Sequence, residues 1–184
     1  MADISDSQGS LLQTEVDNLE RVLLRHARDA FGSSELVKVH WKGLNYLSQP
    51  RFDEACREYD QFAELLERLG VSIEWMTGGD LGLDSIYVRD ASIISDRGVI
   101  LCAMGKGTRS LEPYAQGRVF ERLGVPVHGQ IERTGTIEGG DVTWLDYRTL
   151  AVGRGYRTNE NGIGQLRKLL PDVDILSVSL PHFR

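Results

Sequence analysis

Acidic residues at related positions are the side chains most able to do chemistry in this sequence. Asp84 and Asp90 flank a mostly apolar stretch, and Glu138 and Asp141 enclose two glycines. Two glycines between carboxylates let the backbone approach a ligand closely while the acids face the same space. Each acid taken alone is more often a turn or strand-end residue. Because isolated buried carboxylates are costly, the set as a whole predicts a cationic partner.

Two arginines supply the opposite charge. Arg109 lies in a glycine-rich stretch just before an expected helix, and Arg157 also lies between an expected strand and helix. A guanidinium in such a loop is suited to binding a carboxylate with two hydrogen bonds, although a single arginine is more often solvated at the surface. Acids could bind the positively charged end of a ligand, and arginines could bind its negatively charged end. Together they predict a site for a zwitterion such as an amino acid.

Other reactive side chains give weaker signals. Cys56 falls on the apolar face of an expected helix and Cys102 in an apolar strand, so both are expected in the core. The four histidines, including His182, lack the spacing of metal ligands. The stretch 105–107 lacks the rest of a nucleotide-binding fingerprint. We therefore predict neither a metal nor an organic cofactor.

Composition narrows the class of function. The chain has 184 residues, 41% hydrophobic, with a formal net charge of −6. This acidity argues against a nucleic-acid partner, and no apolar run approaches the length of a membrane span. The first ten residues lack the pattern of a signal peptide, and the presence of two cysteines argues against a fold built on disulfides. These features predict a cytoplasmic α/β protein that acts on a small molecule.

An internal repeat indicates how the elements are organised. The pentapeptide Glu-Arg-Leu-Gly-Val occurs at 67–71 and again at 121–125, and the same spacing carries Asp84 onto Glu138. Each copy is typical of a helix that ends at glycine and leads into a short strand. A repeat of this size predicts one supersecondary unit that is used more than once.

Periodicity and turn residues predict the individual elements. We expect a flexible tail over 1–14 and one domain over 15–184. The expected helices are 15–31, 52–69, 112–123 and 161–170, and the expected strands are 36–41, 71–75, 86–94, 98–104, 125–128, 141–145, 150–153 and 175–180. In this order the chain holds two strand–helix–strand–strand modules and part of a third. The even spacing of Asp84 and Asp90 would place both on one face of a strand.

The stretches 83–94, 105–113, 138–145 and 152–159 resemble, in this order, the guanidino-group-modifying enzymes. That superfamily includes dimethylarginine dimethylaminohydrolase, arginine deiminase and arginine:glycine amidinotransferase. The resemblance implies an α/β fold called the pentein, a propeller of five strand–helix–strand–strand modules around a pseudo-fivefold axis. About three of the five modules are expected in this chain, so the resemblance predicts a partial pentein that is incomplete at its C-terminus.

The resemblance also implies residue roles. A cysteine attacks the guanidinium carbon and a histidine acts as acid and base. By motif, Glu138 matches the glutamate that binds the guanidinium and works with the histidine. Asp90 matches the aspartate that grips the guanidino nitrogens, and Asp84 lies in the same stretch. Arg109 and Arg157 match the arginines that hold the substrate's α-carboxylate, and Asp141 completes the expected substrate-binding set.

Three functions stay open from the sequence. The first is a hydrolase of the guanidino C–N bond in arginine or a methylated relative, with the nucleophilic cysteine and the histidine expected outside this chain. The second is an amidinotransferase, because Arg89 stands where the dimethylaminohydrolases often have an acid. The third is a guanidino-binding module without catalysis. The expected partner is a small arginine-like zwitterion, and the sequence leaves open whether the chain forms a homo-oligomer.

Overall fold

The computed structural model describes residues 15–181, and the predicted tail (1–14) and His182 lie outside the described residues. The helices are α1 (Ala27–Phe31), α2 (Ser34–His40), α3 (Phe52–Arg68), α4 (Glu112–Arg122) and α5 (Glu160–Leu169). The strands are β1 (Arg21–Leu24), β2 (Ser72–Trp75), β3 (Ser92–Ser95), β4 (Gly98–Leu101), β5 (Val127–Gln130), β6 (Val142–Trp144), β7 (Thr149–Arg154) and β8 (Asp174–Ser179). Four short 3₁₀ helices join them: η1 (Leu83–Ile86), η2 (Val88–Ala91), η3 (Gly107–Arg109) and η4 (Gly139–Asp141). Within this range no helix has both the length and the apolar character that crossing a bilayer requires.

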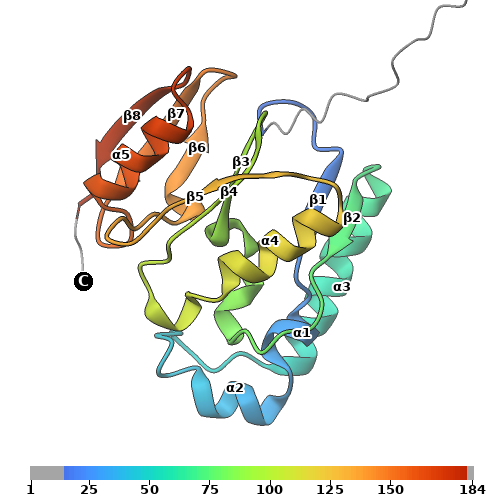
Figure 1. The fold of residues 1–184 in the computed structure, drawn as a ribbon. Helices are drawn as coiled ribbons and strands as arrows, with labels where there is room; N and C mark the ends of the chain where they lie inside the picture. The colour runs from blue at the N-terminus through green and yellow to red at the C-terminus, as the bar shows by residue number, and fades with distance from the viewer. Residues whose placement is uncertain (1–14, 182–184) are drawn as a thin grey trace, which may run out of the picture.

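Hydrogen bonding divides the strands into three sheets that follow one another along the chain (Figure 1). β1 pairs in parallel with β2. In the second sheet β3 is antiparallel to β4, and β4 is parallel to β5 across α4. The third sheet repeats this pattern with β6, β7, α5 and β8. The predicted order of strand, helix, strand, strand holds for β4, α4, β5 and β6, but not for the first module, whose expected strand over 36–41 is a helix. Strand pairing groups each of the hairpins β3–β4 and β6–β7 with the helix that follows it.

The sequence repeat is also a structural repeat. At the end of α3 the N–H of Gly70 donates to the carbonyl of Glu67, and that of Val71 donates to Leu66. At the end of α4 the equivalent N–H groups, of Gly124 and Val125, make the same two bonds. Both glycines have positive φ, which is the Schellman arrangement that ends a helix. In each copy the buried valine then leads the chain into a parallel strand.

The largest core lies between the second and third sheets and joins them. It contains Ile100, Met104, Ile137, Leu150, Val152, Ile163 and Leu166, all almost fully buried. Cys102 belongs to this core, and Cys56 belongs to a second core beneath α1, α2 and α3. The predicted structural placement of both cysteines is confirmed.

Two predictions for the N-terminal region are wrong. The helix expected over 15–31 is strand β1 followed by the short helix α1. Its apolar residues suit a strand buried on both faces, because Leu23 and Leu24 enter different apolar clusters. The strand expected over 36–41 is helix α2, where the Ser33 hydroxyl accepts a hydrogen bond from the N–H of Leu36. This N-cap stabilises a helix, although the alternating apolar pattern of the same residues is typical of a strand.

The strand expected over 86–94 is also wrong over most of its length. The 3₁₀ helices η1 and η2, separated by Tyr87, occupy most of this stretch, and the strand β3 starts only at Ser92. Asp84 lies in η1 and Asp90 in η2, so they do not share a face of one strand. The two successive 3₁₀ turns still bury both carboxylates.

Candidate functional site

The ends of two hairpins bring the predicted site residues together. Asp90 comes just before β3, and Glu138 and Asp141 come just before or at the start of β6. Arg109 follows β4, and Arg157 follows β7. Because each hairpin is antiparallel, the start of its first strand lies beside the end of its second. All of these residues therefore gather at one end of the second and third sheets.

We call this group the carboxylate cluster. Its acids are Asp84, Asp90, Glu112, Glu138 and Asp141, and its cations are Lys106, Arg109 and Arg157. Five carboxylates pair with three cations, and the buried guanidinium of Arg25 adds a further positive charge that acts on Glu112. The six residues predicted from the sequence are all members, and sequence reasoning missed Lys106 and Glu112.

Arg109 lies at the buried centre of the cluster. Its Nε and Nη2 donate to the two carboxylate oxygens of Glu112, at 2.9 and 2.8 Å, and its Nη1 donates to Asp90 at 2.6 Å. Nη2 also donates to the carbonyl of Tyr87 at 3.1 Å. Burial lowers the pKa of Arg109, but Glu112 and Asp90 outweigh that effect and raise it overall. This arginine is therefore held charged by the protein's own acids.

Arg157 joins the two acids of the glycine motif. Its Nη1 lies 3.3 Å from the Glu138 carboxylate, and its Nη2 pairs with Asp141. The hydroxyl of the fully buried Thr158 donates to Asp141 at 2.8 Å and accepts from the Glu138 N–H at 3.2 Å. The side chain of Arg157 is 35% exposed, so this ion pair forms the solvent-facing edge of the cluster.

Glu138 is the most buried of the predicted acids, at 1% exposure. Burial raises its pKa, Arg157 lowers it, and the nearby charge of Asp90 raises it again, so that the pKa stays above its ordinary value. Burial likewise raises the pKa of Glu112, even though Arg109 opposes the shift. In both acids burial is the main cause of the raised pKa, and the neighbouring arginine offsets it only in part.

The loop between β4 and α4 contacts Glu112 at the start of α4 and three acids of other segments. The Gly105 N–H donates to Glu138 at 3.0 Å, Lys106 pairs with Asp84, and Arg109 pairs with Asp90. Gly105 also packs directly on Arg157, because a Cβ at this position would lie 2.9 Å from the Cα atom of Arg157. This one loop therefore fixes the relative positions of the acids.

Several residues near the cluster would have been hard to select from the sequence. Glu112 stands three residues after Arg109, which is the spacing of helical ion pairs, and that spacing was its one available signal. Thr158 had no signal beyond its place next to Arg157. Arg89, by contrast, does not point into the cluster, since its guanidinium binds the carboxylate of Glu15 and the carbonyl of Val142.

Neither cysteine is placed as a nucleophile. Burial raises the pKa of both Cys56 and Cys102, which favours the unreactive thiol. Among residues 15–181 no group of histidine, cysteine and acidic side chains has the arrangement of a metal site. The chemistry that the cluster supports with its own groups is the binding of a cation.

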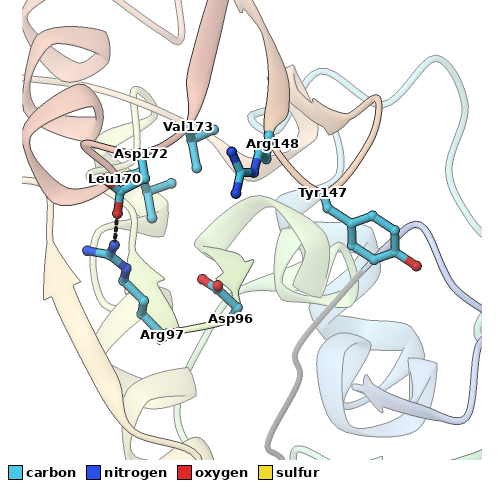
Figure 2. A pocket seen from close by; sticks show the side chains of 7 residues that line it. All are labelled: Asp96, Arg97, Tyr147, Arg148, Leu170, Asp172 and Val173. Atoms are coloured by element: carbon cyan, nitrogen blue, oxygen red, sulfur yellow. Dashed lines mark hydrogen bonds and ion pairs between the residues drawn. The ribbon is translucent and has the colours of Figure 1, made fainter.

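A separate hollow of about 380 Å³ lies at the opposite end of the same hairpins (Figure 2). It is lined by Asp96 and Arg97 after β3, by Tyr147 and Arg148 after β6, and by the loop that follows α5. Arg97 forms an ion pair there with Asp172. No member of the carboxylate cluster lines this hollow, so it is not the candidate site.

Comparison with known proteins points to one family. Residues 84–184, more than half of the chain, match the arginine deiminase family. An N(G),N(G)-dimethylarginine dimethylaminohydrolase of Streptomyces coelicolor is 31% identical over 127 residues, which are 69% of this chain and 48% of that protein. The chain spans about half the length of the curated relatives it matches.

Solved structures share the fold. A dimethylarginine dimethylaminohydrolase variant of Pseudomonas aeruginosa, in complex with citrulline, superposes with a TM-score of 0.73 at 20% identity and covers 91% of this chain and 63% of its own. The N-terminal domain of ArgZ, a cyanobacterial arginine dihydrolase bound to substrate, gives a TM-score of 0.72 at 17% identity, with 88% and 58% covered.

Proposed function

The chain belongs to the arginine deiminase family of the pentein superfamily, and from this membership we propose that its carboxylate cluster binds a guanidinium group for hydrolysis of a C–N bond. The proposed substrate is arginine or a methylated relative. The observation that carries the proposal is that five carboxylates from separate segments gather at one end of the two sheets, where Glu138 and Asp141 share a partly exposed arginine. A bound guanidinium would add positive charge beside these two carboxylates.

Geometry suggests which acids would contact the ligand. Asp90 and Glu112 are engaged by the buried Arg109, whose side chain is 6% exposed. Glu138 and Asp141 share the more exposed Arg157, and each carboxylate has capacity for further hydrogen bonds. We propose that the guanidinium binds at Glu138, beside Arg157, and that Arg157 offers its exposed side to the ligand's carboxylate. Arg109 would then support the site by holding Asp90 in place.

Hydrolysis in this family requires a thiolate. A thiolate adds to the guanidinium carbon, the amine leaves with a proton, and water then releases the ureido product and restores the thiolate. Neither Cys56 nor Cys102 suits this role, because both are buried with raised pKa values. This observation favours a second candidate function, in which the carboxylate cluster binds the guanidino ligand and the covalent step does not take place.

Calorimetry with L-arginine and L-citrulline tests the binding proposal. Citrulline has the same α-carbon groups but a neutral ureido group, so a cation site should bind arginine and reject citrulline. We expect Glu138→Gln to weaken arginine binding about tenfold, because a charge-assisted hydrogen bond contributes about 1.5–3 kcal/mol. The matched control is Glu132→Gln, which alters an exposed glutamate of the preceding loop. Equal binding of arginine and citrulline would refute the proposal.

Product analysis separates the two candidate functions. If the chain hydrolyses arginine, citrulline accumulates with time, and mass spectrometry of quenched samples detects a covalent adduct on a cysteine. If it only binds, calorimetry gives a heat of binding but no citrulline forms. Dimethylarginine as the substrate distinguishes the dimethylaminohydrolase activity from the deiminase activity.

A further inference from the structure

The hollow at the turns of the two hairpins is lined by charged side chains from separate segments (Figure 2). Asp96 and Arg97 come from the turn between β3 and β4, and Arg148 comes from the turn between β6 and β7. Asp172 comes from the loop between α5 and β8. The volume of the hollow, about 380 Å³, lies within the range of small-molecule sites, which is about 300–1,000 Å³. The hollow is therefore large enough for a small ligand.

Two of these four charges are paired with each other, and two are not. Arg97 forms an ion pair with Asp172. Within residues 15–181, which the structure describes, neither the Asp96 carboxylate nor the Arg148 guanidinium forms an ion pair or a side-chain hydrogen bond. Figure 2 shows both groups turned toward the space that separates them. A ligand in this space can therefore pair with both charges without displacing any contact of the protein.

The turns that carry the two unpaired charges are held in place by hydrogen bonds of their own. In the first turn, the buried Ser95 hydroxyl donates to the carbonyl of Gly98 at 2.6 Å. In the second turn, the Asp146 carboxylate accepts from the backbone N–H of Arg148 at 2.8 Å. The indole N–H of Trp144 donates to a carbonyl of β3 at 2.9 Å and so joins the two hairpins. The backbone positions of the two charges are therefore fixed before a ligand binds, which lowers the cost of binding.

The lining of the hollow indicates which class of ligand fits. Its two carboxylates and two guanidiniums give no net charge, so the hollow favours neither an anion nor a cation. The unpaired Asp96 and Arg148 would instead pair with one positive and one negative group of the same molecule. Leu170 and Val173 line the same hollow and offer apolar surface to an aliphatic group. An amino acid with an uncharged aliphatic side chain has all three of these features.

We propose that this hollow is a second site, separate from the carboxylate cluster, and that it binds the zwitterion of an aliphatic amino acid. Arg148 binds the ligand's carboxylate through two N–H groups, and Asp96 binds its ammonium. The side chains of arginine and citrulline fit poorly, because a guanidinium or ureido group would lie against Leu170 and Val173. A ligand held by both charged residues bridges the hairpins of the second and third sheets.

Titration of the isotope-labelled chain with L-valine, followed by NMR, tests the proposal. Because Asp96 and Arg148 are exposed, we expect saturable shifts of the amides in both turns with an affinity on the order of millimolar. Isovalerate lacks the ammonium of valine, and isobutylamine lacks its carboxylate. Each should bind about fivefold more weakly than valine. The absence of saturable shifts with valine would overturn the proposal, and so would equal binding of valine and inorganic phosphate.

Two variants assign the charged groups of the ligand to their partners. Arg148→Gln should make valine no better a ligand than isobutylamine, and Asp96→Asn should make it no better than isovalerate. Both side chains are exposed, so the variants are expected to fold. The matched controls are Arg118→Gln on α4 and Asp80→Asn in the loop before η1, which should leave valine binding unchanged.

The same variants separate this site from the carboxylate cluster. Arginine binding to Arg148→Gln should equal that of wild-type protein, because no member of the cluster lines the hollow. Valine binding that is unchanged in Arg148→Gln or in Asp96→Asn would overturn the second site, whatever the result for arginine.

Discussion

Most N–H groups of Arg109 are already taken by neighbouring groups of the protein. Glu112 receives two of them in a forked pair, Asp90 receives one, and the carbonyl of Tyr87 receives another. Releasing this guanidinium to a ligand would leave two buried carboxylates without a partner, which is costly. Arg109 therefore stabilises the cluster, and its predicted contact with a substrate carboxylate stays a prediction.

Arg109→Met should destabilise the protein strongly. Removing one member of a buried ion-paired group typically costs about 3–5 kcal/mol, because the remaining charges stay buried without compensation. Urea denaturation measures the free energy of unfolding. The control is Arg118→Met, an exposed arginine of α4, which should change that free energy by less than about 0.5 kcal/mol. Similar free energies of unfolding for both variants would show that the buried ion pairs of Arg109 with Asp90 and Glu112 add little stability.

The raised pKa of Glu138 predicts a pH effect with a definite sign. In the folded protein this pKa lies above its ordinary value of 4.5, so the folded state holds the proton more tightly than the unfolded chain. As pH rises from the ordinary value through the raised one, Glu138 therefore lowers the free energy of unfolding. Wild-type protein should lose stability relative to Glu138→Gln as pH increases over this window. A constant difference between the two proteins would contradict the shift.

The acids of the site were predictable from the sequence, but their internal partners were not. Glu138 and Asp141 stand out because two glycines separate them, and Asp84 because the repeat relates it to Glu138. Nothing in the chain reveals that Lys106 reaches Asp84 or that Thr158 bridges Glu138 and Asp141, because these contacts join separate loops. A ligand's carboxylate and a protein carboxylate are also equally good partners for an arginine, so sequence alone cannot distinguish them.

At the scale of elements, the glycine pair in η4 allows two 3₁₀ turns to pack together. A Cβ on Gly139 would lie 2.2 Å from the carbonyl oxygen of Arg89, which belongs to η2. A Cβ on Gly140 would lie 2.3 Å from the carboxylate of Asp90. The sequence predicted a close approach of the backbone to a ligand, whereas the close approach in the structure is to η2 itself. The glycines thus hold Asp90 against the segment that bears Glu138.

Gly139→Ala should therefore separate η4 from η2. The neighbour is a backbone carbonyl that cannot rotate away, so we expect a loss of at least about 1–3 kcal/mol in the free energy of unfolding. Gly164→Ala provides the control, because Gly164 lies in α5 with no atom within 4 Å of an added Cβ. Alanine there should stabilise the helix by about 0.5–1 kcal/mol. Equal thermal stability of the two variants would rule out the tight packing of these turns.

Elements with strong end signals were predictable, and elements decided by distant contacts were not. α3 and α4 end at the repeated glycine, and their boundaries match the prediction to within a residue. β1 carries an apolar pattern that fits a helix equally well, and its strand conformation depends on pairing with β2 far along the chain. The region before β3 was predicted as a strand from its apolar residues, but its two 3₁₀ turns serve to bury Asp84 and Asp90.

At the scale of the whole molecule, β8 is the outer strand of the third sheet in the described part of the chain. Among the residues that the structure describes, β8 pairs only with β7 and lies at the outer side of the fold (Figure 1). Leu176 and Val178 are each 50% exposed, and Leu180 follows them at the same alternating positions. An unpaired edge with an apolar face is a template for association with another chain. Self-association, which the sequence left open, therefore has a specific candidate surface.

Val178→Lys should reduce self-association without changing the fold. A lysine on the edge strand places a charge where a second strand would pair, which disfavours contact between edges. We expect the wild-type weight-average mass in sedimentation equilibrium to rise with concentration above the 20.6 kDa of one chain, and that of the variant to rise much less. Val39→Lys on α2 is the control, because Val39 is even more exposed but belongs to a helix with no open edge. Identical association of wild type and Val178→Lys, or a wild-type mass of one chain at every concentration, would exclude β8 as an association surface.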